Sequence, residues 1–237
     1  LKYWRAQLAG APQMTLATDR PRPSKPAFAG AVHPFEIPAA LLEKVKALAN
    51  SERATLFIAL LAAFQALLAR YADRTDVVVG APVAGRARDE LKPLVGLFVN
   101  TVALRTRWPA NASFRDVLRR ARATALEAHD NAEVPFDEVV RNLLPERELN
   151  ANPLFQVMFN VESETSASLE FGRAVVVNEP VSTAVAKFDL TLSLAPSGNG
   201  FVGGFEYRTD LFDGSTISRM AGHFLRILEA AVDNPDV

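Results

Sequence analysis

Hydrophobic residues recur along this chain with two periods, and the two patterns alternate from one end to the other. Apolar residues three or four positions apart predict helices, whereas short apolar runs bounded by Gly, Pro or Asn predict strands. Helices are expected at residues 1–9, after Pro38, after Thr55, after the capping pair Ser113 and Asp116, at Pro135 and after Asp213. Strands are expected at residues 30–37, 76–83, 97–107, 154–161, 174–177, 188–195 and 201–207, with a hairpin turn at residues 197–200. This order predicts an α/β (α+β) sandwich, in which helices cover one face of a mixed sheet.

The helix after Thr55 is apolar on nearly all sides, which predicts a buried helix. Its apolar stretch, residues 56–69, contains Gln65 and is too short to span a bilayer. Residues 17–26 differ in kind, because they carry three prolines among Arg20, Arg22 and Lys25. That composition predicts an extended, solvated connector. We therefore divide the chain into a helix end with a Pro-rich connector, residues 1–28, and a globular lobe, residues 29–237.

An unusual polar pair, Asn100 and Thr101, stands in the apolar run of residues 94–105. A buried strand normally avoids Asn, because an unpaired amide in a core costs about 1–3 kcal/mol. The pair therefore indicates a fixed hydrogen-bonding role, either within the core or on the wall of a channel.

Composition narrows the function classes. The chain of 237 residues has a net charge of −1, so no global charge attracts it to nucleic acid or to an anionic membrane. It has no cysteine, which excludes disulfides, thiolate nucleophiles and Cys-ligated metals. No basic flank followed by an apolar run marks a secretory signal, and a cytoplasmic location is the expectation.

The residues alone give no self-sufficient catalytic centre. The three histidines are His33, His129 and His223, and no two of them have the spacing of a helical metal pair. We interpret the charged cluster that follows His129 as a solvated loop and expect no metal site. No G-x-S-x-G sequence is present, and the glycines between 198 and 204 fit a hairpin and a close-packed strand rather than a phosphate-binding loop.

Several segments nevertheless match one family in its own order. Residues 96–105 resemble the "GxFVNTxxxR" motif of nonribosomal peptide synthetase condensation domains, and residues 80–86 are similar to "GxPVxGR". Residues 129–140 resemble "HQDxPFExVV" with one extra residue, and residues 152–159 fit "RNPLFQVMF" with Ala151 in place of the Arg. The segments at residues 3–8, 188–190 and 212–224 also look familial. The chain thus resembles the C-terminal half of a condensation domain, one lobe of a chloramphenicol-acetyltransferase-like fold.

The resemblance implies a parent reaction and its partners. In that reaction, the amine of a carrier-bound aminoacyl thioester attacks a carrier-bound peptidyl thioester. The family's HHxxxDG motif lies in its N-terminal half and is absent from this sequence, so we expect the lobe to be inactive alone, with no catalytic residue of its own. The implied partners are the N-terminal lobe, carrier (thiolation) domains that bear phosphopantetheine, and an adjacent adenylation domain. No cofactor is expected to bind the lobe directly.

The resemblance also suggests site residues. Arg86 lies in the segment that supplies an Arg to the Asp of HHxxxDG, and the alternative is a surface Arg beside Arg88. Asn100 and Thr101 are candidates for lining the tunnel, or else form a satisfied core pair at a strand end. Pro135 and Phe136 are expected chiefly to pack and to start a helix, with a tunnel-facing role as the alternative. Asp189 is expected near the acceptor side, and residues 162–187 to contain a latch that crosses to the other lobe.

Two other functions stay open. The chain could be a natural module that docks carrier or adenylation domains without catalysis, or half of a related epimerization or cyclization domain. An exposed apolar face at the position of the missing lobe favours the catalytic interpretation, because monomers rarely leave large apolar patches uncovered.

Overall fold

The strands form one mixed sheet in the computed structural model, which describes residues 1–86, 88–143, 152–162 and 183–237. Across the six described strands the order is β1-β6-β5-β4-β2-β3. Their bounds are Gly30–Ile37 for β1, Asp76–Val83 for β2, Asn100–Arg107 for β3, Val157–Val161 for β4, Leu190–Ser197 for β5 and Gly200–Arg208 for β6. Strand β4 runs parallel to β2 and β5, while the other neighbours are antiparallel. Ser197 pairs with Gly200 across the predicted hairpin turn.

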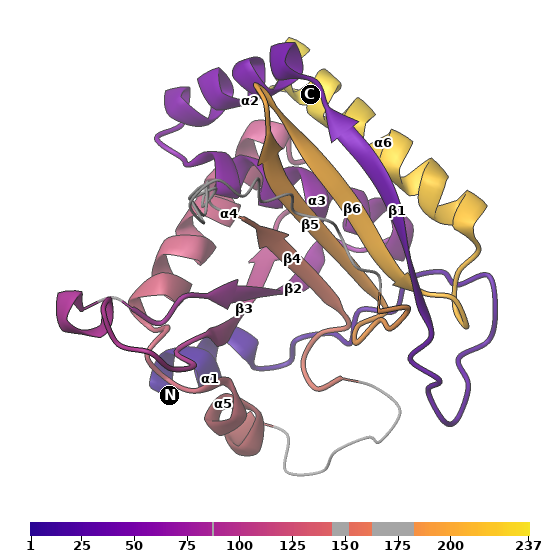
Figure 1. Cartoon of the computed structure of the whole chain (residues 1–237). Coiled ribbons are helices and arrows are strands. Elements are labelled where there is room, and N and C mark those ends of the chain that lie inside the picture. Colours follow the sequence, from indigo (N-terminus) through magenta and orange to yellow (C-terminus); the bar gives the residue numbers. More distant parts are fainter. Residues whose placement is uncertain (87, 144–151, 163–182) are drawn as a thin grey trace, which may run out of the picture.

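Helices cover one face of this sheet, as the hydrophobic pattern predicts (Figure 1). Helices α2, α3, α4 and α6 lie behind the sheet, whereas α1 and α5 lie beside the end of β3. The helix bounds are Lys2–Leu8 for α1, Ala39–Ser51 for α2, Leu56–Ala72 for α3, Phe114–Asp130 for α4, Phe136–Leu143 for α5 and Gly214–Asp233 for α6. A single 3₁₀ turn, η1, covers Asp89–Leu91. The predicted capping box of Ser113 and Asp116 is present at the start of α4.

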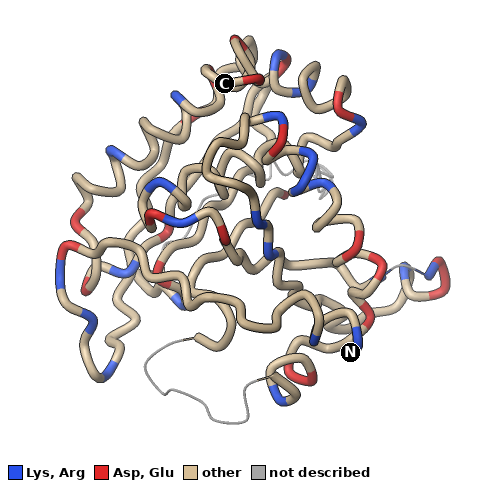
Figure 2. The backbone as a smooth tube through the Cα atoms, turned by 180° about the vertical axis from the view of Figure 1, so that it is seen from behind, with Lys and Arg blue, Asp and Glu red and all other residues tan. Residues whose placement is uncertain are grey.

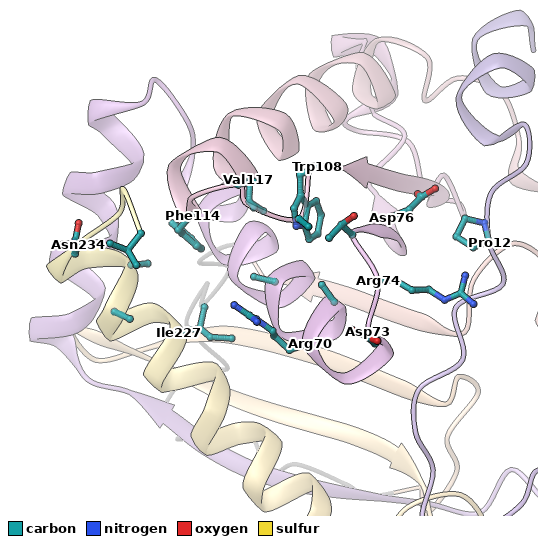
Figure 3. A pocket seen from close by; sticks show the side chains of 18 of the residues that line it. Pro12, Arg70, Asp73, Arg74, Asp76, Trp108, Phe114, Val117, Ile227 and Asn234 are labelled. Atoms are coloured by element: carbon teal, nitrogen blue, oxygen red, sulfur yellow. The ribbon is translucent and has the colours of Figure 1, made fainter.

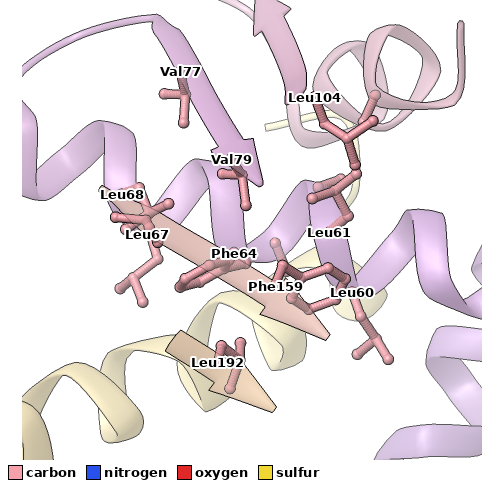
Figure 4. Close-up of a cluster of buried hydrophobic side chains, with 14 of the residues drawn as sticks. Leu60, Leu61, Phe64, Leu67, Leu68, Val77, Val79, Leu104, Phe159 and Leu192 are labelled. Atoms are coloured by element: carbon pink, nitrogen blue, oxygen red, sulfur yellow. The ribbon is translucent and has the colours of Figure 1, made fainter. Parts of the chain in front are cut away.

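Helix α3 is the centre of the core (Figure 4). Eleven of its 17 residues are buried, because it lies between the sheet and the flanking helices α4 and α6. Its Phe64 packs against Phe159 of β4 and Phe205 of β6, with ring centroids 5.7 and 6.1 Å apart. Full burial of one such side chain stabilises the fold by about 1.5–3 kcal/mol. The contacts between α3 and the strands therefore hold the sheet against the helices.

Strand β3 is shorter than predicted, and the polar pair stands at its beginning rather than in its middle. The ladder with β2 ends where Val83 pairs with Asn100. Beyond that pair the ladder of hydrogen bonds stops, so the apolar residues 94–99 form no strand. Strand β4 also starts late, because Leu154 adopts a φ of 68°, which a strand does not allow. The strand predicted at residues 174–177 lies outside the described residues.

The Pro-rich connector has no helix or strand and is largely exposed, as predicted, but it is also tied to the lobe by side-chain contacts. Asp19 accepts hydrogen bonds from the backbone N–H of Asp213 (2.8 Å) and from the Thr216 hydroxyl (2.9 Å). It thereby ties a distant part of the chain to the start of α6, while the side chain of Asp213 pairs with Arg20 at 2.5 Å. The connector is bound because its charged residues meet opposite charges on the lobe.

Charged residues of both signs are interspersed over the described surface (Figure 2), in keeping with the net charge of −1. None of the described helices alone has the length and hydropathy needed to cross a bilayer. Helices α2 and α3 reach that threshold only as a pair, across a bend of 102°.

Arg105, the last residue of the "GxFVNTxxxR" segment, is 4% exposed and fastens α1 to the sheet. Its guanidinium donates to both carboxylate oxygens of Asp76, at 2.8 and 2.7 Å. The remaining N–H groups donate to the carbonyl oxygens of Gln7, Ala9 and Gly10, at 2.8 to 3.3 Å. All five guanidinium donors are therefore occupied, which is what a buried cation requires.

We predict that Arg105→Ala lowers the free energy of unfolding by about 3–5 kcal/mol, because it leaves Asp76 and three carbonyls without their donor. Chemical denaturation measures this change. Arg107→Ala, at an exposed position of the same strand, is the matched control and should stay within about 0.5 kcal/mol of the unaltered chain. Equal losses of unfolding free energy in the two variants would show that the Arg105 network stabilises the fold no more than an exposed arginine does.

Candidate functional site

The segment between β2 and β3 projects beyond the sheet on the left of Figure 1. We call residues 84–86 and 88–99 the arm. Its apolar side chains point into solvent: Val95 and Leu97 are 104% and 90% exposed, and Val99 is 58% exposed. A solvated loop normally carries polar residues, so this exposure indicates a surface that another body covers.

Arg86 organises the arm from within. Its Nη1 donates to the carbonyl oxygens of Leu91, of Leu94 at 2.9 Å and, more weakly, of Lys92 at 3.4 Å, and its Nη2 donates to the carbonyl of Gly96 at 3.2 Å. The guanidinium also lies 4.3 Å from the centroid of the Phe98 ring. One partly exposed guanidinium thus binds the carbonyls of a segment that has no regular strand ladder of its own.

The base of the arm is closed by a contact that only glycine permits. Gly85 has a φ of 64°, and a Cβ at that position would lie 1.8 Å from the carbonyl oxygen of Phe98. The two limbs of the arm therefore touch where they leave β2 and β3. A side chain at residue 85 would force them apart.

Asn100 begins β3 directly below the arm, and its amide is fully used. Its Nδ2 donates to the carbonyls of Ala132 and Val134, both at 2.8 Å, and its Oδ1 accepts from the backbone N–H of Phe136 at 3.0 Å. It therefore ties β3 to the segment that leads into α5, which is the hydrogen-bonding role that its polar position indicates. Its neighbour Thr101 pairs with Pro82 of β2.

Pro135 and Phe136 start α5, as expected, and Phe136 opens a row of aromatic rings. The ring centroids of Phe136 and Phe155 are 5.3 Å apart, and those of Phe155 and Phe188 are 5.8 Å apart. The row lies over Gly80, where a Cβ would come within 2.1 Å of the Phe155 ring. Because Val79 of the same strand faces the helices (Figure 4), Gly80 and this row lie on the opposite face.

Asp189 follows Phe188 and lies within a chain of charges. It is 3% exposed and receives two hydrogen bonds from Arg22 of the connector, one of them at 3.0 Å. Arg208 lies 3.5 Å away and pairs with Asp210 at 2.6 Å. The hydrogen bond to Asp189 raises the pKa of Arg22, and the hydrogen bond from Arg208 lowers the pKa of Asp210. The two arginines thus meet both carboxylates in a largely buried cluster, which suits a positioning role.

The predicted site residues thus form one connected path rather than a pocket. Arg86 contacts Phe98 in the arm, and β3 begins two residues later with Asn100, which binds the backbone of Phe136. The aromatic row then leads from Phe136 to Phe188, beside Asp189. Sequence reasoning missed Phe155 as the middle ring, although it lies in the matched segment of residues 152–159. The latch expected at residues 162–187 lies largely outside the described residues.

A cavity lies elsewhere, between α3, α4 and the end of α6 (Figure 3). It measures about 1120 Å³, and Trp108, Arg70 and Ile227 are among the residues on its wall. Its described lining includes none of the predicted site residues. Among the described residues, no group of three or more His, Asp and Glu side chains is arranged to hold a metal ion.

Comparison with known proteins identifies the family. The family model described as "Condensation domain" matches residues 1–237. Linear gramicidin synthase subunits C and B of Brevibacillus parabrevis are 46% and 44% identical to the chain over 239 residues. These alignments cover 100% of the chain but only 3% and 5% of the two enzymes.

Solved structures agree with the family match. The X-domain from teicoplanin biosynthesis is 27% identical and superposes with a TM-score of 0.90, covering 100% of this chain and 54% of that one. A four-domain nonribosomal peptide synthetase bound to AMP and glycine shares the fold, with a TM-score of 0.92 at 24% identity over 100% of this chain and 19% of that one. The chain therefore belongs to the condensation-domain family of nonribosomal peptide synthetases.

Proposed function

We propose that this chain is the C-terminal lobe of a condensation domain, which forms amide bonds together with an N-terminal lobe that carries the HHxxxDG motif. The amine nitrogen of an aminoacyl thioester attacks the carbonyl carbon of a peptidyl thioester. The C–N bond forms, the C–S bond breaks, the amine gives up a proton, and the upstream carrier leaves as a free thiol. Because both substrates are tethered, positioning them in an enclosed site is the main contribution of the two lobes.

The exposed apolar arm is the observation that carries this proposal. Val95 and Leu97 have no cover on the described lobe, whereas the core beneath the sheet is closely packed. A partner lobe that covers the arm removes these side chains from water, which favours association by about 25 cal/mol for each Å² of apolar surface buried. The 54% coverage of the teicoplanin X-domain supports the same division, because it is the coverage expected of one of two lobes.

The candidate residues then take roles at the lobe interface. All four described side-chain hydrogen bonds of Arg86 come from Nη1 and Nη2, and no described group accepts from its Nε–H. The Nε edge is thus available to a carboxylate of the partner lobe, which we assign to the Asp of HHxxxDG. The His of that motif orients or deprotonates the amine.

The remaining residues serve the path of the substrates. We propose that Asn100, Thr101, Pro135 and Phe136 line or support the tunnel, and that Asp189 holds the acceptor side in place. The substrates arrive as thioesters on the phosphopantetheine arms of carrier domains, and an adenylation domain loads the downstream carrier. The lobe itself supplies shape and fixed polar groups.

The covered-arm proposal predicts the behaviour of a charged arm. With the N-terminal lobe supplied as a separate chain, Val95→Asp together with Leu97→Asp should weaken association at least about tenfold, because a carboxylate must lose water to enter an apolar contact. Titration calorimetry measures the affinity, and mass spectrometry of the carrier-bound product measures amide formation. Leu126→Asp, a comparable substitution at a 46% exposed apolar residue of α4, is the control. Absence of binding by the unaltered chain, or equal weakening by the control, would count against the proposal.

A second prediction separates the support role of Asn100 from direct tunnel lining by Thr101. Asn100→Ala should lower the free energy of unfolding by about 1–3 kcal/mol, since one N–H and two carbonyls lose their partner. Thr101→Val should leave stability within about 0.5 kcal/mol and change the KM for the carrier-bound substrate if that side chain faces the tunnel. Denaturation and steady-state kinetics on the two-lobe complex give both readouts. An unchanged KM in Thr101→Val would remove this residue from the tunnel wall.

A further inference from the structure

We infer that Arg86 builds the arm into a preformed docking element, so that a partner lobe meets a fixed shape instead of ordering a loose loop. The identity of that partner rests on the proposed function. The shape of the arm does not, because every contact in the argument lies within this chain.

An exposed loop of this kind is expected to be mobile. It has one short 3₁₀ turn, η1, and the side chains of Val95, Leu97 and Val99 are exposed on the described lobe. Ordering such a segment at the moment of binding costs about 1–2 kcal/mol for each residue fixed, which weakens association. A loop that is ordered beforehand avoids that cost, and this is the effect known as preorganisation.

Arg86 supplies the order that the sheet does not. Its guanidinium donates to four carbonyl oxygens, those of Leu91, Lys92, Leu94 and Gly96. These carbonyls come from the outer half of the arm, whereas Arg86 itself lies at its base. The side chain therefore joins the tip of the arm to the point where the arm leaves β2.

Two further contacts hold the guanidinium in place. The Phe98 ring lies against one side of it, with the centroid 4.3 Å from Cζ. The backbone of Gly85 meets the carbonyl of Phe98, so the limb that carries Arg86 and the limb that carries Phe98 cannot separate without losing both contacts. Arg86 is thus clamped between the limbs that it connects.

The planar fork of the guanidinium is essential to this arrangement. Nη1 and Nη2 point in fixed directions toward carbonyls on both sides, which the rotating ammonium of a lysine cannot reproduce. The Nε–H of the same guanidinium has no described acceptor and stays available to a carboxylate of a partner lobe. Arg86 is therefore a positioning residue that couples the shape of the arm to the charge of the group that docks on it.

Hydrogen exchange on the isolated chain tests this inference. In the arm, the amides of Leu91, Lys92 and Leu94 donate to the carbonyls of Arg88, Asp89 and Leu91, so their exchange reports the shape of the arm. We expect Arg86→Ala and Arg86→Lys each to speed exchange of these amides at least about tenfold, as local opening becomes easier. Arg88→Ala removes a 71% exposed arginine from the same arm and should leave the rates within about twofold. Amides of α3 report whether each variant is folded.

The outcomes separate the two proposals. Unchanged exchange in Arg86→Ala, or equal acceleration in Arg88→Ala, overturns the preformed arm, whatever the partner does. Fast exchange in both Arg86 variants, with α3 still protected, supports it. If the arm is ordered by Arg86 but the separately supplied N-terminal lobe fails to bind the unaltered chain, the proposed function fails while the preformed arm stands.

Discussion

The register between β2 and β3 is the constraint on which the candidate site depends. The ladder ends at the pair of Val83 and Asn100, and that end point decides where the chain leaves the sheet. It places Gly85 against Phe98 and leaves Val95, Leu97 and Val99 exposed. It also sets Asn100 at the edge, where its amide reaches the segment before α5. Because a slip of one residue would turn every side chain of β3 to the other face, the arm and the path below it share a single anchor. Arg105 reinforces that anchor by tying β3 to β2 and α1 at the other end of the strand.

Local pattern predicts most of the elements, and it fails where distant residues decide the outcome. The limits of β1 and β2 follow from short apolar runs bounded by Gly, Pro or Asp, and the capping of α4 follows from the nearby Ser113–Asp116 pair. The start of β3 does not, because residues 94–99 read as a strand until the partner strand ends. Likewise Asp213 is the N-cap residue of α6, as its position predicts, but its side chain caps no helix N–H, and its own N–H donates to Asp19, almost two hundred residues away.

The candidate site shows the same division. The polar pair in an apolar run indicates a hydrogen-bonding role for Asn100, and the structure gives it three backbone partners. Nothing in the sequence pattern indicates that Arg86 gathers four carbonyls, because those acceptors are backbone atoms that any residue carries. The middle ring of the aromatic row, Phe155, is visible only once Gly80 is seen beneath it. The sequence pattern thus identifies residues that need hydrogen-bond or packing partners, and the fold determines which partners those are.

The bound connector has a consequence for the engineering of hybrid synthetases. Asp19 contacts residues 213 and 216 at the start of α6, and Arg22 contacts Asp189. The connector that precedes β1 is therefore a structural part of the lobe. A recombination junction placed in this proline-rich segment separates Asp19 and Arg22 from their partners, although the sequence there is typical of a linker without structural contacts. A graft that carries the connector together with the lobe keeps buried Asp189 with Arg22, and keeps exposed Asp19 with the start of α6.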